Sequence, residues 1–443
     1  MLTRREALGS ILYPAAFTAL GGFSAAASPP TKRAVDAAID AAVGLAPPAG
    51  ASPDDVARDE SFWIQVQQAF TVDRSIVNLN NGGVSPSPAL VQESVKRHQD
   101  WCNSYPSALA LLGELTPQVE AVRRQLAAAF GADAEELAIT RNASEGLQIC
   151  QNGFDLKPGD EVLATTQDYP RMIQTFQQRE RREGIVLKQI QIPVPLDDPE
   201  QAVALYEQAI GPRTKLILMC HVINLTGQVL PVKSVVAMAR RHGLPVIVDG
   251  AHALAHLDFR IDALDCDYYA SSLHKWLFAP HGTGLLYVRR DKIGALWPLT
   301  AAAPTLNENI RKFEEIGTHP LAPTLGIAEA LEFHEGLGPA RKQARMLYLR
   351  DWWAKRLLQQ PAVRLHTSLA PGAASGVATV SIEGVDTGKL RAWLWDKNRI
   401  LTTGIDHPEV QGLRISPSVY TSLEELDRFC TAMERVASGG LPA

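Results

Sequence analysis

The sequence lacks a surplus of basic residues. Its 443 residues include 43 Lys and Arg against 48 Asp and Glu, which gives a formal net charge of −5. A protein that binds a polyanion normally shows the opposite balance, so nucleic acid is not expected as a partner. Beyond residue 27 the chain also lacks an apolar run long enough to span a bilayer, so no membrane partner is expected for the mature chain. Its composition, 46% hydrophobic and 21% charged, is typical of a globular protein with two or three domains.

Cysteine is scarce, and its spacing excludes familiar metal motifs. The five cysteines form no CxxC pair and have no metal-ligand spacing, so no metal site is expected; they are Cys102, Cys150, Cys220, Cys266 and Cys430. Scattered cysteines in odd number are most simply small core residues. A structural disulfide or a reactive thiol is the alternative.

The first 27 residues are typical of an export signal. Thr3-Arg4-Arg5 precedes a weakly apolar stretch from Ile11 to Phe23, and Ala25-Ala26-Ala27 fits a small-residue cleavage site. Paired arginines ahead of a mild apolar core predict the twin-arginine route, and hence a periplasmic protein. That route carries folded proteins, so a protein that must capture a ligand in the cytoplasm before export would need it. An ordinary secretory signal or a frayed terminus is the alternative.

The mature chain begins with a segment rich in Ala, Pro and Asp, and then alternates between helix and strand patterns. Residues 28–60 are interpreted as a linker or N-terminal arm. The expected helices are Pro117–Phe130, Arg171–Glu183 and Pro231–His242, and the expected strands are Glu161–Thr165, Val186–Ile192, Lys215–Cys220, Pro245–Val248, Tyr268–Ser271 and Gly284–Val288. Helices that alternate with continuously apolar strands predict an α/β fold whose mainly parallel sheet is covered on both faces.

The pattern changes after about residue 320. Expected helices Thr324–Leu337, Pro339–Gln359, Thr387–Lys397 and Leu423–Ala437 surround one expected strand, Val377–Ile382. We therefore expect a large domain at 96–317 and a smaller α+β domain at 318–443, to which residues 61–95 contribute an N-terminal part.

A lysine follows one of the expected strands. Lys275, in Ser271-Ser272-Leu273-His274-Lys275-Trp276, lies just past the strand's carboxyl end. Open α/β sheets bind ligands in the crevice at this edge. Taken alone, a solvated surface lysine is the simpler interpretation.

A carboxylate occupies the same place on another strand. The strand Pro245–Val248 delivers Asp249, followed by Gly-Ala-His252. A carboxylate there can pair with the protonated pyridine nitrogen of pyridoxal 5'-phosphate (PLP), which keeps the ring an electron sink. The alternative is a helix N-cap, for which Asp before Gly-Ala is also suited.

The third element is a turn from strand to helix. In Thr140-Arg141-Asn142-Ala143-Ser144-Glu145-Gly146, an expected strand, Leu137–Thr140, passes through small polar residues into a helix. Free backbone N–H groups and the helix dipole can cradle a phosphate there. A capped helix start without a ligand is the alternative.

In this chain order the three elements resemble the class V aminotransferase family of PLP enzymes, which has the fold-type-I architecture. The resemblance covers roughly residues 75 to 435, and its most specific part runs from Asp249 through Lys275. The family includes cysteine desulfurases, isopenicillin N epimerase-like proteins and serine-type transaminases.

The resemblance implies a role for each matching residue. Lys275 would carry PLP as a Schiff base and move the Cα proton of the substrate, while Asp249 pairs with the pyridine nitrogen. The other implied cofactor contacts are Ala143, Ser144, Ser272 and His274 on the phosphate, Asn224 on the ring hydroxyl, and Thr318 on the phosphate of a neighbouring subunit, which implies a homodimer. Arg414 would clamp the α-carboxylate of the substrate, for which a bidentate fork is suited, and the segment Asn80-Asn81-Gly82-Gly83 would line the substrate site. A surface ion pair is the alternative for Arg414.

The sequence departs from its relatives at two places. Tyr169, in Gln167-Asp168-Tyr169-Pro170, stands where desulfurases carry a histidine over the ring, and would supply aromatic area. His252 replaces a common glutamine, and would bind the ring oxygen, act on the substrate or simply pack. A desulfurase also needs a thiolate shortly before the arginine, but residues 402–411 contain no cysteine, and Cys430 follows Arg414.

We therefore expect a PLP-dependent aminotransferase for an amino acid, or for an amino-acid side chain carried by a peptide. The export signal with this fold is similar to exported enzymes that modify siderophore side chains. Epimerisation and elimination stay open, because all three reactions begin by removing the Cα proton. A PLP-fold binding protein without catalysis is the non-enzyme alternative, against which the presence of Lys275 argues.

Overall fold

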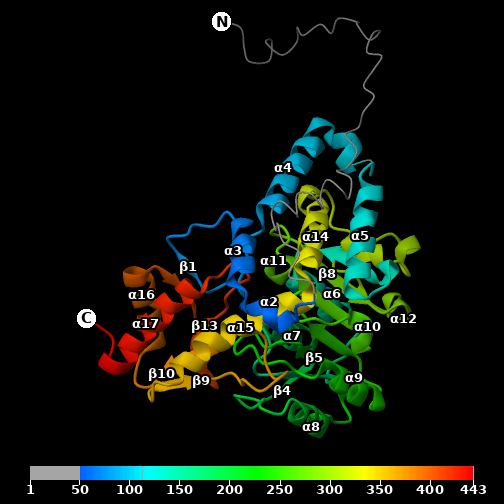
Figure 1. Cartoon of the computed structure of the whole chain (residues 1–443). Helices are drawn as coiled ribbons and strands as arrows, with labels where there is room; N and C mark the ends of the chain where they lie inside the picture. Colours follow the sequence, from blue (N-terminus) through cyan, green and yellow to red (C-terminus); the bar gives the residue numbers. More distant parts are fainter. Residues whose placement is uncertain (1–49, 112, 443) are drawn as a thin grey trace, which may run out of the picture.

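The computed structural model of the protein describes residues 50–111 and 113–442. Figure 1 shows a large region built around a central sheet and a smaller region that contains the C-terminus. The expected export signal, residues 1–27, and residues 28–49 of the expected arm lie outside the described residues. None of the helices described in these ranges is long and apolar enough to cross a membrane.

A seven-stranded sheet forms the centre of the large region. β8 runs against the other strands, because it pairs antiparallel with both of its neighbours. The order across the sheet is β2 (Leu137–Thr140), β8 (Gly284–Val288), β7 (Tyr268–Ser272), β6 (Val246–Asp249), β5 (Thr214–Cys220), β3 (Glu161–Thr165) and β4 (Val186–Ile190). The structure thus confirms the predicted α/β fold with a mainly parallel sheet.

Both faces of the sheet are buried, which explains why its strands are continuously apolar. Along β5, Leu216 and Leu218 pack in one hydrophobic cluster, while Ile217 and Met219 pack in another on the opposite face. The first face is covered by α6 (Ala143–Gly153) and α7 (Pro170–Glu183). The second face is covered by α5 (Thr116–Phe130), α8 (Glu200–Ala209), α9 (Val232–Arg241), α10 (Ile261–Leu264) and α14 (Ile327–Leu337).

The smaller region contains a four-stranded antiparallel sheet, which confirms the predicted α+β character of the C-terminal part. Its order is β12 (Thr403–His407), β13 (Val410–Ile415), β10 (Ala378–Ile382) and β9 (Val363–Leu365). The helices beside it are α15 (Pro339–Leu357), α16 (Thr387–Asn398) and α17 (Leu423–Gly439). Near the start of the described chain, β1 (Val77–Asn78) pairs in parallel with β11 (Ile400–Leu401), so residues 77–78 join this region.

Within the segment 28–60, interpreted from the sequence as a linker or N-terminal arm, residues 53–58 form the helix α2 (Pro53–Arg58). The Ser52 side chain caps this helix by accepting a hydrogen bond from the Asp55 backbone N–H at 3.2 Å. Arg345 of α15 donates to the Ala57 carbonyl oxygen at 2.9 Å, and Val56 is buried. Tertiary packing against α15 thus decides the structure of a segment whose composition indicates a loop.

The helix expected at Thr324–Leu337 is divided in two by Gly326. A Cβ atom at Gly326 would lie 2.8 Å from Cγ2 of Val95, so the chain bends where another helix passes closely. The remaining α-helices of the described chain are α3 (Glu60–Gln68), α4 (Ala89–Ser104), α11 (Leu273–Trp276), α12 (Arg290–Ile293) and α13 (Ala322–Leu325).

Gly227→Ala should destabilise the fold by at least about 2 kcal/mol. Gly227 has φ +76°, and an added Cβ atom would lie 1.9 Å from the carbonyl oxygen of Val377, where the two regions meet. Urea unfolding measures the change. Gly211→Ala is the control, because the nearest atom to its added Cβ lies at 3.9 Å. Equal stability of the two variants would contradict this account of the contact.

Candidate active site

A cavity of about 400 Å³ opens at the carboxyl edge of the central sheet, beside the ends of β5, β6 and β7. This is the edge at which open α/β sheets bind ligands. Nine of the predicted site residues line it: Ala143, Ser144, Tyr169, Asn224, Asp249, His252, Ser272, His274 and Lys275. Residues far apart in the sequence are therefore brought together as the motifs predicted.

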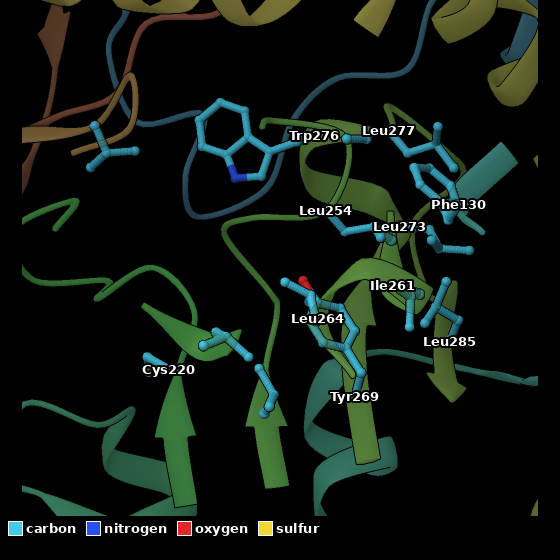
Figure 2. Packing of buried hydrophobic residues seen from close by; sticks show 14 of the residues in the cluster. Phe130, Cys220, Leu254, Ile261, Leu264, Tyr269, Leu273, Trp276, Leu277 and Leu285 are labelled. Carbon is cyan, nitrogen blue, oxygen red and sulfur yellow. The ribbon is translucent and has the colours of Figure 1, made fainter. Parts of the chain in front are cut away.

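Lys275 lies on the short helix α11, which directly follows β7. Its neighbours Leu273 and Trp276 are buried, and Figure 2 shows both among other apolar side chains of the core. The Nζ atom of Lys275 lies 3.2 Å from Nε2 of His252. Burial lowers the pKa of Lys275 to about 8, although the nearby Asp249 opposes this shift. Roughly a tenth of the amine is therefore neutral and nucleophilic near pH 7, unlike that of a solvated lysine.

Asp249 is the last residue of β6, and it is buried. It pairs in register with Cys220 of β5 on one side and Ala270 of β7 on the other. Burial raises the pKa of its carboxyl group, which Lys275 partly offsets. One carboxylate oxygen accepts from the Ala251 N–H at 2.9 Å, as in the N-cap alternative, yet the residue also lines the cavity. The carboxylate thus stabilises its own turn and remains beside the ligand space.

His252 is buried between Lys275 and the loop that contains Gly82. Burial, followed by the positive charge of Lys275, lowers the pKa of His252 well below its usual range, so the ring is neutral. Its Nδ1 atom has no partner among the described residues. A Cβ atom at Gly82 would lie 3.2 Å from Cε1 of His252. Gly82 therefore leaves room for the imidazole at the edge of the cavity.

The start of α6 is the element predicted to cradle a phosphate, and one of its backbone amides already has a partner. The Asn142 side chain caps the helix by accepting from the Glu145 N–H at 2.8 Å. The Ala143 N–H, expected to bind phosphate, donates instead to Oγ of Ser272 at 2.9 Å. This bond orients the Ser272 hydroxyl and leaves its hydrogen available as a donor beside Ser144.

His274 is held in one tautomer by the backbone. Its Nδ1 lies 3.0 Å from the Thr283 carbonyl oxygen, which can only accept, so Nδ1 carries the hydrogen. Burial, followed by the charge of Lys275, lowers the pKa of His274 to about 4. To donate to a phosphate through Nε2, His274 must gain a proton, which a bound dianion would favour.

Arg414 is buried on β13 behind the cavity lining. Its guanidinium donates to the Asn224 carbonyl oxygen at 3.0 Å and to Oδ1 of Asn80 at 3.1 Å, while Nε has no partner among the described residues. Burial lowers its pKa to about 10, partly opposed by Tyr169. The described residues offer it no carboxylate within ion-pair distance, so the surface ion pair considered from the sequence is wrong. A buried cation without a counter-ion favours binding of an anion.

None of the four remaining predicted residues lines the cavity: Gly82 and Arg414 lie beside it, and Asn81 and Thr318 make no contact with it. The Asn81 side chain is fully buried and donates to the Asn78 and Ser416 carbonyl oxygens, each at 3.0 Å, while it accepts from the Tyr420 hydroxyl at 2.6 Å. These bonds occupy the amide, so the predicted substrate contact of Asn81 is not supported. Thr318 is exposed and does not line the cavity of its own chain.

Sequence reasoning missed several residues that shape the site. Arg171 lines the cavity, whereas Asn80, which holds Arg414, and Gly83, which also lines the cavity, belong to the segment that the sequence had already indicated. Asp168 is buried and accepts from the backbone N–H groups of Thr165 at 2.7 Å and Cys220 at 2.9 Å. Burial raises the pKa of Asp168 to about 6. The available signal was its position just after a strand, which it shares with Asp249.

The cysteines support their interpretation as structural residues. Cys150, Cys220, Cys266 and Cys430 are buried, Cys102 is partly buried, and all five are unpaired. Burial raises the pKa of the Cys220 thiol, the cysteine that lines the cavity, well above its usual range. In place of a cysteine-bearing loop, residues 403–415 form the hairpin of β12 and β13.

The fold and the site define a PLP-dependent enzyme family. The model of the family described as Aminotransferase class-V matches residues 77–429, and the chain belongs to this family. Members of the family use PLP, as the sequence motifs predicted.

The chain is similar to enzymes that carry different names. The chain is 32% identical to isopenicillin N epimerase of Amycolatopsis lactamdurans, over 85% of this chain and 98% of that enzyme. It is 27% identical to a probable cysteine desulfurase of Vibrio cholerae, over 81% of this chain and 93% of that protein. Among solved structures, a variant of C-DES with glycine covalently linked to its PLP cofactor superposes with a TM-score of 0.75 at 25% identity, over 83% of this chain and 98% of that one.

The donor and acceptor groups around the cavity fit PLP. Oδ1 of Asn224 and Nδ1 of His252 are buried without partners among the described residues, which is costly unless a ligand satisfies them. Asn224 and His252 would bind the ring oxygen region, Asp249 the pyridine nitrogen, and Lys275 the aldehyde carbon. The phosphate would lie at the start of α6, beside Ser272 and His274.

Uptake of PLP by the apoprotein should become faster as pH rises and reach half its maximal rate near pH 8. The reason is that only the neutral amine of Lys275 attacks an aldehyde, and the pKa of Lys275 is about 8. The visible absorption band of lysine-bound PLP follows the reaction. Lys275→Ala should give no such band. If the rate of PLP loading did not change between about pH 6.5 and 9.5, the lowered pKa of Lys275 would be contradicted.

Proposed function

We propose that the protein is a PLP-dependent aminotransferase that acts on an amino acid, or on an amino-acid side chain carried by a peptide. The observation that carries the proposal is the placement of an amine of lowered pKa, Lys275, beside a carboxylate, Asp249, and near a buried guanidinium, Arg414. These three groups match the needs of removing a proton from the Cα of a substrate that bears a carboxylate.

The chain's own residues have distinct tasks in this reaction. When bound, PLP withdraws electrons from the Cα–H bond of the amino acid. Arg414 binds the α-carboxylate through its two terminal nitrogens, which fixes the orientation of Cα. The neutral amine of Lys275 removes the Cα proton and returns it to another carbon, with Nε2 of His252 at 3.2 Å to hold the amine. Asp249 would keep the pyridine nitrogen protonated, because its negatively charged carboxylate stabilises the positive charge on the ring.

Epimerisation is the second candidate, favoured by one observation. Isopenicillin N epimerases of Amycolatopsis lactamdurans and Streptomyces clavuligerus are 32% and 30% identical to the chain and are covered over 98% of their lengths. Epimerisation requires a second acid, which returns the proton to the opposite face of Cα. Tyr169 is our candidate for this acid, since it lines the cavity from the β3–α7 connection, whereas Lys275 lies on α11.

We further propose that the enzyme is exported by the twin-arginine route to the periplasm and works there as a homodimer. The support for export is the pair Arg4-Arg5, which stands ahead of a weakly apolar stretch and a small-residue cleavage site. The exposed position of Thr318 supports its reaching a neighbouring subunit rather than its own cavity.

A panel of amino acids, Glu included, tests the reaction. We expect one donor to convert the visible band of the purified holoenzyme to that of the pyridoxamine form, with release of a keto acid. Lys275→Ala should show no turnover, because the group that moves the proton is lost. A persistent band with deuterium entering Cα from solvent, and no keto acid, would replace the aminotransferase by an epimerase. Full activity of Lys275→Ala would contradict both reactions.

Arg414→Met should raise the KM for the amino acid by about 100-fold, because a charge-assisted contact with the carboxylate is lost. Steady-state kinetics measures the change, and the visible PLP band shows whether the cofactor site stays intact. Arg364→Met is the matched control, since Arg364 is 58% exposed in an ion pair with Glu383 on the surface of the same region. An unchanged KM in Arg414→Met would remove Arg414 from the substrate site.

A further inference from the structure

Three hydrogen bonds join the β12–β13 hairpin of the small region to the loop that follows β3 in the large region. In the β12–β13 turn, Oε1 of Glu409 accepts from the Thr166 hydroxyl at 2.5 Å, and Oε2 accepts from Nε2 of Gln167 at 2.7 Å. Nε2 of His407 lies 3.0 Å from the Thr166 carbonyl oxygen. We call Thr166, Gln167, His407 and Glu409 the clasp. It links the small antiparallel sheet to the loop that follows β3.

One tautomer of His407 satisfies both of its contacts. Its Nδ1 accepts from the Glu409 backbone N–H at 3.2 Å, so the hydrogen of the neutral ring is on Nε2. That hydrogen is donated to the Thr166 carbonyl oxygen. The clasp therefore forms with an uncharged imidazole.

Gln167 is the buried anchor of the clasp. Its side chain is fully buried, and the two hydrogens of Nε2 go to Glu409 and to the Ile192 carbonyl oxygen at 2.5 Å. Glu409 has no cation within ion-pair distance among the described residues, so the hydroxyl of Thr166 and the amide of Gln167 stabilise its charge. Hydrogen bonds to an ionised acceptor are shorter and stronger than neutral ones.

The clasp lies between Tyr169, which lines the cavity, and Arg414, which is proposed to bind the substrate carboxylate. On the large region, Gln167 is followed by Asp168, whose carboxylate is fixed by backbone N–H groups, and then by Tyr169 in the cavity lining. On the small region, Glu409 precedes β13, which contains Arg414. Each group is only a few residues along the chain from the clasp, so movement at Glu409 is transmitted to both.

We infer that Glu409 is a positioning residue, which acts through Thr166 and Gln167 to hold Tyr169 and Arg414 in register across the cavity. This inference rests on the proposed function, in which Arg414 binds the substrate carboxylate. Glu409 lies on the β12–β13 hairpin, and its hydrogen bonds fix this hairpin against the loop that follows β3.

Three variants of the full-length holoenzyme test the inference. Glu409→Ala removes both acceptor oxygens. Glu409→Gln should rescue, because a carboxamide can accept from Gln167 and donate to the Thr166 hydroxyl once that hydroxyl rotates. Asp406→Asn is the matched control, since Asp406 is exposed on the same hairpin and accepts a hydrogen bond only at 3.3 Å, from Gln411.

Two readouts do not depend on turnover. In Glu409→Ala, amides of residues 165–169 and 410–415 should exchange hydrogen about tenfold faster, and the visible circular dichroism of bound PLP should decrease. The melting temperature should stay within about 2 °C of that of Asp406→Asn. With the amino donor identified above, KM should rise about tenfold, with a smaller change in kcat. Glu409→Gln should restore most of each value.

The outcomes separate the two proposals. Unchanged exchange in both segments of Glu409→Ala, or the same change in Asp406→Asn, would overturn the positioning role. If exchange and circular dichroism change as expected but the wild-type protein turns over no amino acid, the clasp holds and the aminotransferase proposal fails.

Discussion

The register between β6 and β7 is the constraint on which the site depends. Asp249 pairs with Ala270, so the chain leaves β7 beside the carboxylate and reaches Lys275 within one turn of helix. The amine cannot retreat into solvent, because Leu273 and Trp276 hold α11 in the core. Burial on both faces of the sheet fixes this register, since a slip by one residue would exchange the side chains of the two hydrophobic clusters.

Burial then gives the site its electrostatic character. The same desolvation lowers the pKa of Lys275 and of Arg414 and raises that of Asp249. The described residues therefore stabilise the charges of these three groups incompletely. In addition, Oδ1 of Asn224 and Nδ1 of His252 are buried without a hydrogen-bond partner among the described residues. A cavity of this kind is expected to gain stability from an anionic, aromatic ligand such as PLP, which satisfies several of these groups together.

The small region completes the site from the other side. β13 supplies Arg414, whose guanidinium reaches the Asn224 carbonyl oxygen in the large region, and the clasp joins the same hairpin to the Tyr169 loop. These contacts are among several hydrogen bonds that join the two regions. The described hairpin of β12 and β13 contains no cysteine.

Much of the cofactor site was determined by the sequence alone, because each element is local. The short patterns are the apolar strand that ends in Asp249, the strand that precedes Lys275 and the turn at Ala143. Residues that follow parallel strands lie together at the carboxyl edge of the sheet, so these patterns predict one shared site. The tertiary structure alone decided the contacts between residues that are far apart in the sequence. The Ala143 amide donates to Ser272, and the Asn81 side chain is hydrogen-bonded to Tyr420 and Ser416. Residues 53–58 form a helix that packs against α15, and Glu409 accepts a hydrogen bond from Gln167. Those contacts join residues that no local pattern relates, so burial and hydrogen-bond geometry determine them.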